Sequence, residues 1–123
     1  MTLTNREIAE AFSSHRFDEA LPFVADDAEW TLVGETDLKG VAAITAACRS
    51  TGAELADSAT RFTRFDVAAD GDLVAVDAIG IYTDSAGDTS SVASCDFYTF
   101  RDGRIVGIRS YTVEVTPNPD PAT

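Results

Sequence analysis

The chain has 123 residues, of which 45% are hydrophobic, and a formal net charge of −12. Its length and hydrophobic content suit one domain with a single core and exclude a chain that is disordered throughout. The negative charge repels phosphate backbones and argues against nucleic acid as a partner. No apolar run approaches the roughly 20 residues of a membrane span, and MTLTNREIAEAF lacks the basic and apolar regions of a signal peptide. We therefore expect a cytoplasmic protein with no membrane partner.

A capping box opens the first predicted helix. Thr4-Asn5-Arg6-Glu7 supplies a hydroxyl and, three residues on, a carboxylate that satisfy free backbone N–H groups. The helix is expected to end near Ser13-Ser14-His15, with His15 a solvated turn residue. The elements predicted next are a short helix over Phe17 to Val24, limited by Pro22, a strand over Ala28 to Val33, a loop over Gly34 to Gly40, and an alanine-rich helix from Val41 to Arg49 that ends near Gly52.

Four extended runs fill most of the remaining chain. They cover Thr60 to Ala69, Leu73 to Thr83, Ser90 to Arg101 and Arg104 to Val115. Asp-Gly pairs at residues 70–71 and 102–103 are strong hairpin signals, and a third turn falls around Ala86-Gly87. The proline-rich tail TPNPDPAT is expected to be disordered. The sequence therefore predicts one domain over residues 1–115 and a tail over residues 116–123.

This order of elements predicts an α+β fold, in which three N-terminal helices wrap a curved antiparallel sheet into a cone. Such a cone encloses an internal pocket suited to a small molecule. Cys48 and Cys95 are interpreted as small buried hydrophobic residues, since two cysteines make a poor disulfide framework and do not have metal-ligand spacing. The sequence contains no phosphate-binding loop and no cluster of metal ligands, so we expect no metal and no organic cofactor.

Three segments resemble a known family. They are Phe23 to Trp30 (FVADDAEW), Leu38 to Ile44 (LKGVAAI) and Asp96 to Ile105 (DFYTFRDGRI). Through them the chain, from Ile8 to Val115, resembles the SnoaL-like branch of the nuclear transport factor 2-like superfamily, a branch similar to polyketide cyclases, ketosteroid isomerase and limonene epoxide hydrolase. The resemblance implies the cone fold but leaves the chemistry open, because this fold hosts enzymes, binding modules and assembly domains.

The resemblance can be followed at single residues. Asp96 matches the aspartic acid that stays protonated in ketosteroid isomerase and donates a hydrogen bond to the developing oxyanion. The general base of that enzyme falls near Leu32 and its oxyanion tyrosine near Ile8, so these roles are vacant. The Arg-x-Asp motif of limonene epoxide hydrolase matches Ala75-Val76-Asp77, with alanine in place of arginine, and its second aspartate falls near Ser110. The sequence therefore departs from both chemistries.

Asp96 and Asp77 are the predicted catalytic residues. If both line the pocket, burial and mutual repulsion raise the pKa of one carboxyl and leave an acid beside a base. Two alternatives stay open: either aspartate bonds a buried hydroxyl such as that of Tyr98, or one of them faces solvent because the register is shifted by one residue. The residues predicted to bind substrate are Trp30, Leu32, Tyr98, Ile79, Ile81, Ser94, Ile108, Ser110 and Thr112.

The leading interpretation is a protein that binds an apolar, oxygen-bearing small molecule and uses a pocket carboxylate for cyclisation, isomerisation or addition of water. The retained aspartates favour this interpretation, whereas the missing base at Leu32 favours a non-catalytic binding protein. A third interpretation is an assembly domain that works through its exposed sheet. Cys95, Phe97 and Tyr111 are expected on the outer sheet surface, and such an apolar patch predicts a symmetric homodimer.

Overall fold

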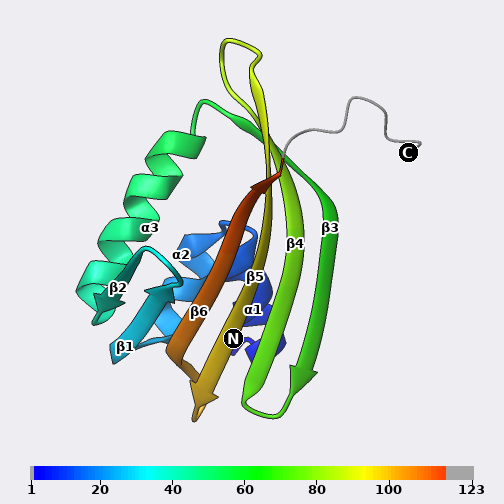
Figure 1. Cartoon of the computed structure of the whole chain (residues 1–123). Helices are drawn as coiled ribbons and strands as arrows, with labels where there is room; N and C mark the ends of the chain where they lie inside the picture. The colour runs from blue at the N-terminus through cyan, green and yellow to red at the C-terminus, as the bar shows by residue number, and fades with distance from the viewer. Residues whose placement is uncertain (1, 116–123) are drawn as a thin grey trace.

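Helices lie against one face of a curved sheet in the computed structural model, which describes residues 2–115 (Figure 1). No helix of this part of the chain is long and apolar enough to cross a membrane. The predicted tail over residues 116–123 lies outside the described residues. The elements of residues 2–115 are α1 (Asn5–Ser13), α2 (Phe17–Ala20), a 3-10 helix η1 (Leu21–Phe23), β1 (Val24–Leu32), β2 (Thr36–Lys39), α3 (Val41–Leu55), β3 (Ala59–Asp70), β4 (Leu73–Thr83), β5 (Thr89–Arg101) and β6 (Arg104–Val115).

The strands form one sheet in the order β2-β1-β6-β5-β4-β3, which curves without closing on itself (Figure 1). The predicted α+β fold with a curved, helix-covered sheet is confirmed. One pair differs from the expectation of an antiparallel sheet, because β1 runs parallel to β6. Alternation along a strand sets which face a residue occupies, but it carries no information on the relative direction of strands that are far apart in the chain. The sheet is therefore mixed.

The capping box fixes the start of α1. The backbone N–H of Glu7 donates to Thr4 Oγ1 at 3.1 Å, and the N–H of Thr4 donates to Glu7 Oε1 at 2.9 Å. The apolar face of α1, with Ile8 and Phe12 buried, packs onto the concave side of the sheet. Core residues on that side of the sheet include Val74, Val76, Tyr98, Phe100 and Ile108. This packing brings the C-terminal end of α1 against the middle of β5.

Four elements differ clearly from their predicted bounds. Strand β1 begins at Val24, four residues before the predicted start at Ala28. The second helix is α-helical only over α2, since Pro22 lacks an N–H and the chain continues as the short η1. The loop predicted between Gly34 and Gly40 contains β2, which pairs with β1. Helix α3 continues past Gly52 to Leu55, because a glycine inside a helix costs only about 1 kcal/mol and does not end it by itself.

Two glycines offer a matched test of backbone conformation. Neither Gly52 in α3 nor Gly34 after β1 has any atom within 4 Å of an added Cβ, but Gly34 has a φ of +85°. Gly52→Ala should raise the free energy of unfolding by about 0.5–1 kcal/mol, because alanine favours the helix. Gly34→Ala should lower it by about 1–2 kcal/mol, because its backbone is left-handed. Urea unfolding followed by circular dichroism measures both. Equal effects of the two changes would contradict the assignment of helical backbone to Gly52 and left-handed backbone to Gly34.

Candidate functional site

A cavity of about 550 Å³ lies between the helices and the concave face of the sheet. This volume falls within the roughly 300–1,000 Å³ typical of small-molecule sites. Its aromatic lining consists of Phe12, Phe17, Trp30, Phe62 and Tyr82. Its polar lining includes Ser13, His15, Ser94, Asp96, Ser110 and Thr112. The wall therefore combines apolar rings with a few hydroxyl groups, one imidazole and one carboxyl deep in the sheet.

Asp96 lies in the middle of β5, opposite Val76 on β4 and Ser110 on β6. The hydroxyl of Ser13, the last residue of α1, donates to Asp96 Oδ2 at 2.8 Å. Ser13 Oγ also lies 2.6 Å from the hydroxyl oxygen of Tyr98. Because Ser13 has a single proton to donate, Tyr98 is the donor of this second bond. Two hydrogen bonds thus connect the fully buried Tyr98 hydroxyl to the carboxylate.

Burial is the main influence on the Asp96 carboxyl, and it raises the pKa. Removing a carboxylate from water disfavours its charged form, so the protonated acid persists to higher pH. Hydrogen bonds from Ser110 and Ser13 and the charge of His15 lower the pKa, but they do not outweigh burial. Asp96 is therefore an acid whose proton is retained above the ordinary range for aspartate.

Trp30 is fixed in the cavity wall by a hydrogen bond and a ring contact. Its Nε1–H donates to Ser110 Oγ at 2.8 Å. Its ring meets Phe12 edge to face, with centroids 5.1 Å apart. Since Ser110 accepts from Trp30, the hydroxyl proton of Ser110 remains for Asp96. The indole position and the state of the carboxyl group are therefore linked through one serine.

Most of the predicted site residues lie in the cavity wall or directly behind it. Tyr98 and Ile108 face the concave side but belong to the core, with exposed fractions of 0% and 1%. Tyr98 reaches the site only through its hydrogen bond with Ser13. The predicted residues that line the cavity are Asp96, Trp30, Leu32, Ser94, Ser110 and Thr112.

The predicted position of Asp77, Ile79 and Ile81 in the pocket is wrong. The sheet register pairs Val76, and not Asp77, with Asp96. Asp77 therefore lies on the outer face, where its carboxylate is half-exposed and 3.7 Å from the guanidinium of Arg64. Ile79 and Ile81 share that outer face, because side chains alternate along β4. The predicted pairing of two aspartates in one pocket, and the match to an Arg-x-Asp motif, both fail by one residue of register.

His15 lies in the turn after α1, as predicted, but its imidazole is part of the cavity wall and not simply solvated. Its ring centroid lies 5.7 Å from that of Phe17 and 6.0 Å from those of Phe62 and Tyr82. Burial lowers the pKa of the imidazole, while the charge of Asp96 acts to raise it. Nothing in the local sequence indicates this environment, because β3 and β4 supply two of the three rings.

Tyr82 reaches the cavity because Gly80, two residues earlier on the same face of β4, has no side chain. A Cβ at Gly80 would lie only 2.9 Å from the Tyr82 hydroxyl, so the ring lies back over the strand at that position. Burial raises the pKa of Tyr82, and the charge of Asp96 raises it further. Tyr82 therefore offers the cavity a protonated hydroxyl. The alternation of side chains along β4 predicts that Gly80 and Tyr82 share a face, but it does not show that this face is the concave one.

Neither cysteine contributes a reactive thiolate to the cavity. Cys48 is buried in the core, and burial raises its pKa to about 12. Cys95 is half-buried on the outer face opposite Asp77, and both cysteines are free thiols. Among residues 2–115, no three His, Cys, Asp or Glu side chains gather in a group that could hold a metal ion.

The raised pKa of Asp96 predicts a pH-dependent cost to stability. The folded state binds the Asp96 proton more tightly than the unfolded state, so the free energy of unfolding falls as pH rises from the ordinary aspartate pKa near 3.8 through the raised folded pKa. Asp96→Asn removes this cost, so its gain in melting temperature over the wild type should grow as the pH rises from about 4 and level off once the folded carboxyl is ionised. Thermal unfolding across this range, with the outer-face change Asp77→Asn as control, measures it. A gain that is flat with pH would contradict the raised pKa.

Comparisons with known proteins agree with this architecture. Among solved structures, an NTF2-like protein of unknown function from Cytophaga hutchinsonii has a TM-score of 0.76 and 26% identity, covering 86% of this chain and 93% of that chain. A polyketide-cyclase candidate from Xanthomonas campestris has a TM-score of 0.68 and 22% identity, covering 88% and 92%. An LEH-like epoxide hydrolase from M. tuberculosis has a TM-score of 0.67 and 20% identity, covering 89% and 82%.

At these identities the second and third likenesses show a shared fold and not a shared reaction. A search of curated proteins gave no match to this chain. The family model for the SnoaL-like domain matches residues 5–108, which include all of the helices and every strand except the end of β6. The chain belongs to the SnoaL-like domain family.

Proposed function

We propose that the cavity binds an uncharged, largely apolar small molecule that carries oxygen, and that Asp96 is the acid that acts on it. The single observation that carries this proposal is the buried, hydroxyl-bonded Asp96 carboxyl in the wall of a cavity of about 550 Å³. A protonated carboxyl in an apolar site can donate a hydrogen bond, or a proton, to an oxygen on which negative charge develops. Cyclisation, isomerisation and opening of an epoxide by water all pass through such an oxygen.

The charges of the wall support an uncharged ligand. Asp96, Glu35 and Glu54 line the cavity, whereas no Lys or Arg side chain of the described residues does. A ligand carboxylate or phosphate would therefore meet acidic groups without a matching cation, in a chain whose net charge is already −12. The aromatic rings of Phe12, Phe17 and Trp30 instead suit a flat or cyclic apolar body.

Binding without turnover is the second candidate, and one observation favours it. Leu32 stands in the cavity wall beside Trp30, at the end of β1. An alkyl side chain there cannot take a proton from a bound molecule, so β1 supplies no general base. A cavity that contained only an acid would bind and polarise an oxygen without completing a proton transfer.

Ligand charge gives the test of the proposed function, using 2-naphthol and 2-naphthoate as matched probes. Trp30 is the only tryptophan, so its indole N–H gives a single NMR signal that reports on the cavity. We expect 2-naphthol to shift this signal saturably at pH 7, and 2-naphthoate to bind at least about tenfold more weakly, a difference of about 1.4 kcal/mol. Replacing Glu35 and Glu54 together by glutamine should reduce this discrimination, because their carboxylates repel the naphthoate, and the outer-face change Asp77→Asn should leave it intact. Equal binding of both probes, or of neither, would contradict the proposal.

The outer face of the sheet supports a second, structural part of the proposal, a homodimer. Tyr111 and Val113 are 46% and 64% exposed on the outer face of β6. Phe97 lies beside them on β5, with its ring 6.1 Å from that of Tyr111 and the Arg109 guanidinium 5.4 Å above it. A contiguous apolar surface of this kind favours self-association. A second copy of this chain is the simplest partner, because a two-fold axis makes one patch cover another.

Replacing Val113 on the outer face should break the proposed dimer. Sedimentation equilibrium at tens of micromolar, on the order expected for a specific pair, should show dimers for the wild type and monomers for Val113→Asp. Val33→Asp is the control, since Val33 is similarly apolar and 42% exposed but lies in the turn after β1. A wild type that sediments only as a monomer, or a control that dissociates equally, would rule out this interface.

A further inference from the structure

The backbone at the end of α1 places His15 at a position that normally belongs to glycine. The N–H of His15 donates to the carbonyl of Phe12 at 3.1 Å, and the N–H of Arg16 donates to the carbonyl of Ala11 at 2.8 Å. These two bonds form a Schellman motif, whose C′ residue adopts the left-handed conformation. His15 is that residue, with a φ of +68°.

A histidine at this position gives the protein a lower free energy of unfolding than a glycine would. Left-handed backbone costs a residue with a Cβ roughly 1–2 kcal/mol, and glycine avoids this cost. Such outliers persist where the surrounding structure enforces them, and they gather at functional sites. The strain at His15 therefore directs attention to its imidazole, since the turn itself does not need a side chain.

Three aromatic rings hold the imidazole of His15 in the cavity wall. Phe17, Phe62 and Tyr82 surround it, and they come from the α2 start, β3 and β4. Asp96 lines the same cavity from β5. Among the described residues, no hydrogen bond or ion pair joins His15 to Asp96, whose Oδ2 accepts from Ser13. Both groups remain available to a molecule that lies between them.

We propose that His15 is the proton acceptor that works with Asp96 on the molecule bound in the cavity. This inference rests on the proposed function, and it supplies the base that Leu32 cannot. For a bound ketone, a neutral imidazole nitrogen takes the proton from the carbon next to the carbonyl. The C–H electron pair forms a carbon–carbon double bond, and the carbonyl oxygen takes the proton of Asp96. The products are an enol, an imidazolium and a carboxylate, so protons and charge balance.

The surroundings of His15 suit this role. Burial favours the neutral imidazole, which is the form that can accept a proton. The ionised Asp96 left after the step then stabilises the imidazolium across the cavity. The other titratable groups near His15 are Tyr82 on β4, Glu54 on α3 and Glu35 after β1 in the same cavity. Around the neighbouring hollow they are Arg16, Asp18, Glu19, Cys48 and Arg49.

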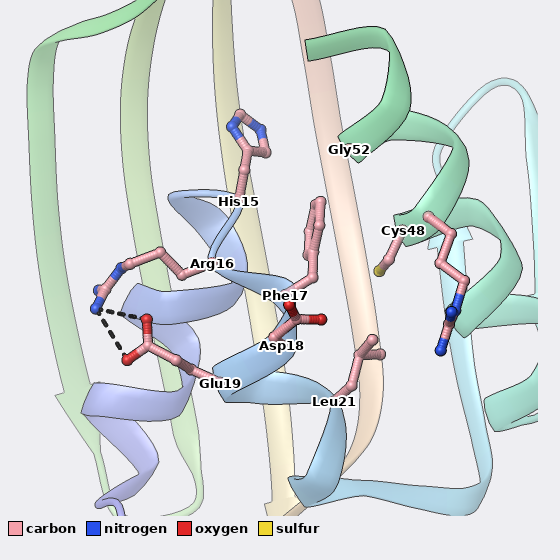
Figure 2. A pocket seen from close by; sticks show the side chains of 9 residues that line it. His15, Arg16, Phe17, Asp18, Glu19, Leu21, Cys48 and Gly52 are labelled. Carbon is pink, nitrogen blue, oxygen red and sulfur yellow. Dashed lines mark hydrogen bonds and ion pairs between the residues drawn. The ribbon is translucent and has the colours of Figure 1, made fainter. Parts of the chain in front are cut away.

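A second hollow gives the imidazole a route to water. It has a volume of about 340 Å³ and lies beside α2 and α3 (Figure 2). His15 and Phe17 line both this hollow and the cavity. In Figure 2, His15 and Phe17 project to the same side of the chain, while Arg16 turns away to pair with Glu19 at 3.4 Å. His15 can therefore face the bound molecule and still lose its proton to solvent afterwards.

The first experiment measures the coupling of the two groups without any ligand. His15 is the only histidine, so its imidazole signals can be titrated by NMR without ambiguity. We expect Asp96→Asn to lower the pKa of His15 further, because the carboxylate charge that raises it is lost. Asp77→Asn, on the outer face, should leave the titration unchanged. Carbon-13 NMR of the Asp96 carboxyl shows whether it is ionised while the imidazole titrates. A His15 pKa that is the same in the wild type and in Asp96→Asn, although Asp96 is ionised over that pH range, would overturn the proposal.

The second experiment measures proton abstraction with 2-tetralone, an apolar bicyclic ketone whose C–H groups exchange with deuterium in D₂O. The wild type should accelerate this exchange with a bell-shaped pH dependence, because the step needs a neutral imidazole and a protonated Asp96 at the same time. His15→Asn and His15→Gly, which both accept left-handed backbone, should lose roughly 100-fold of the acceleration. They should still bind the ketone, as reported by the Trp30 signal, and Asp77→Asn should match the wild type.

The outcomes separate the two proposals. Loss of exchange in both His15 variants with binding retained supports His15 as the acceptor. Exchange that is lost in Asp96→Asn but persists in the His15 variants overturns the role of His15 and leaves the acid role of Asp96 in place. A wild type that binds 2-tetralone without accelerating exchange overturns both catalytic roles and leaves a binding protein.

Discussion

The hydrogen bonds from Tyr98 through Ser13 to Asp96 hold the site together, because they join the end of α1 to the centre of the sheet. Ser13 donates to the carboxylate at 2.8 Å and lies 2.6 Å from the Tyr98 hydroxyl, and both bonds span more than 80 residues of sequence. They fix where α1 ends on the concave face, and so they fix the turn that carries His15. The cavity wall, the acid and the imidazole thus depend on one serine.

The two faces of the sheet carry different kinds of residues. The concave face holds the core and the cavity, and the only aspartate of β4, Asp77, is excluded from it. Asp96 therefore has no second carboxylate across the strand, and burial rather than repulsion between acids raises its pKa. An acid of this kind responds to what fills the cavity, since a ligand that expels water strengthens both the burial and the hydrogen bonds.

Local patterns predicted the fold well, because each depends on neighbours in the chain. The capping box, the Asp-Gly turns and the bounds of β4 and β6 all agree with the structure. The site was predicted in part. Asp96 and Ser110 were placed correctly, but alternation in β4 gives two similarly apolar faces and cannot tell which is concave, so Asp77 was misplaced. His15 was missed because its environment comes from strands about 50 residues and more further along.

Two features that lower the stability of the fold line the same cavity, and this coincidence is the strongest physical argument for function. A buried Asp96 and a left-handed His15 each lower stability, and the simple replacements Asn and Gly would relieve them. Folding alone gives no reason to keep either, since the hydroxyl chain needs only an acceptor and the Schellman turn needs no side chain. Groups that a fold retains against its own stability, and that face one cavity from two elements, are most simply explained by what that cavity holds.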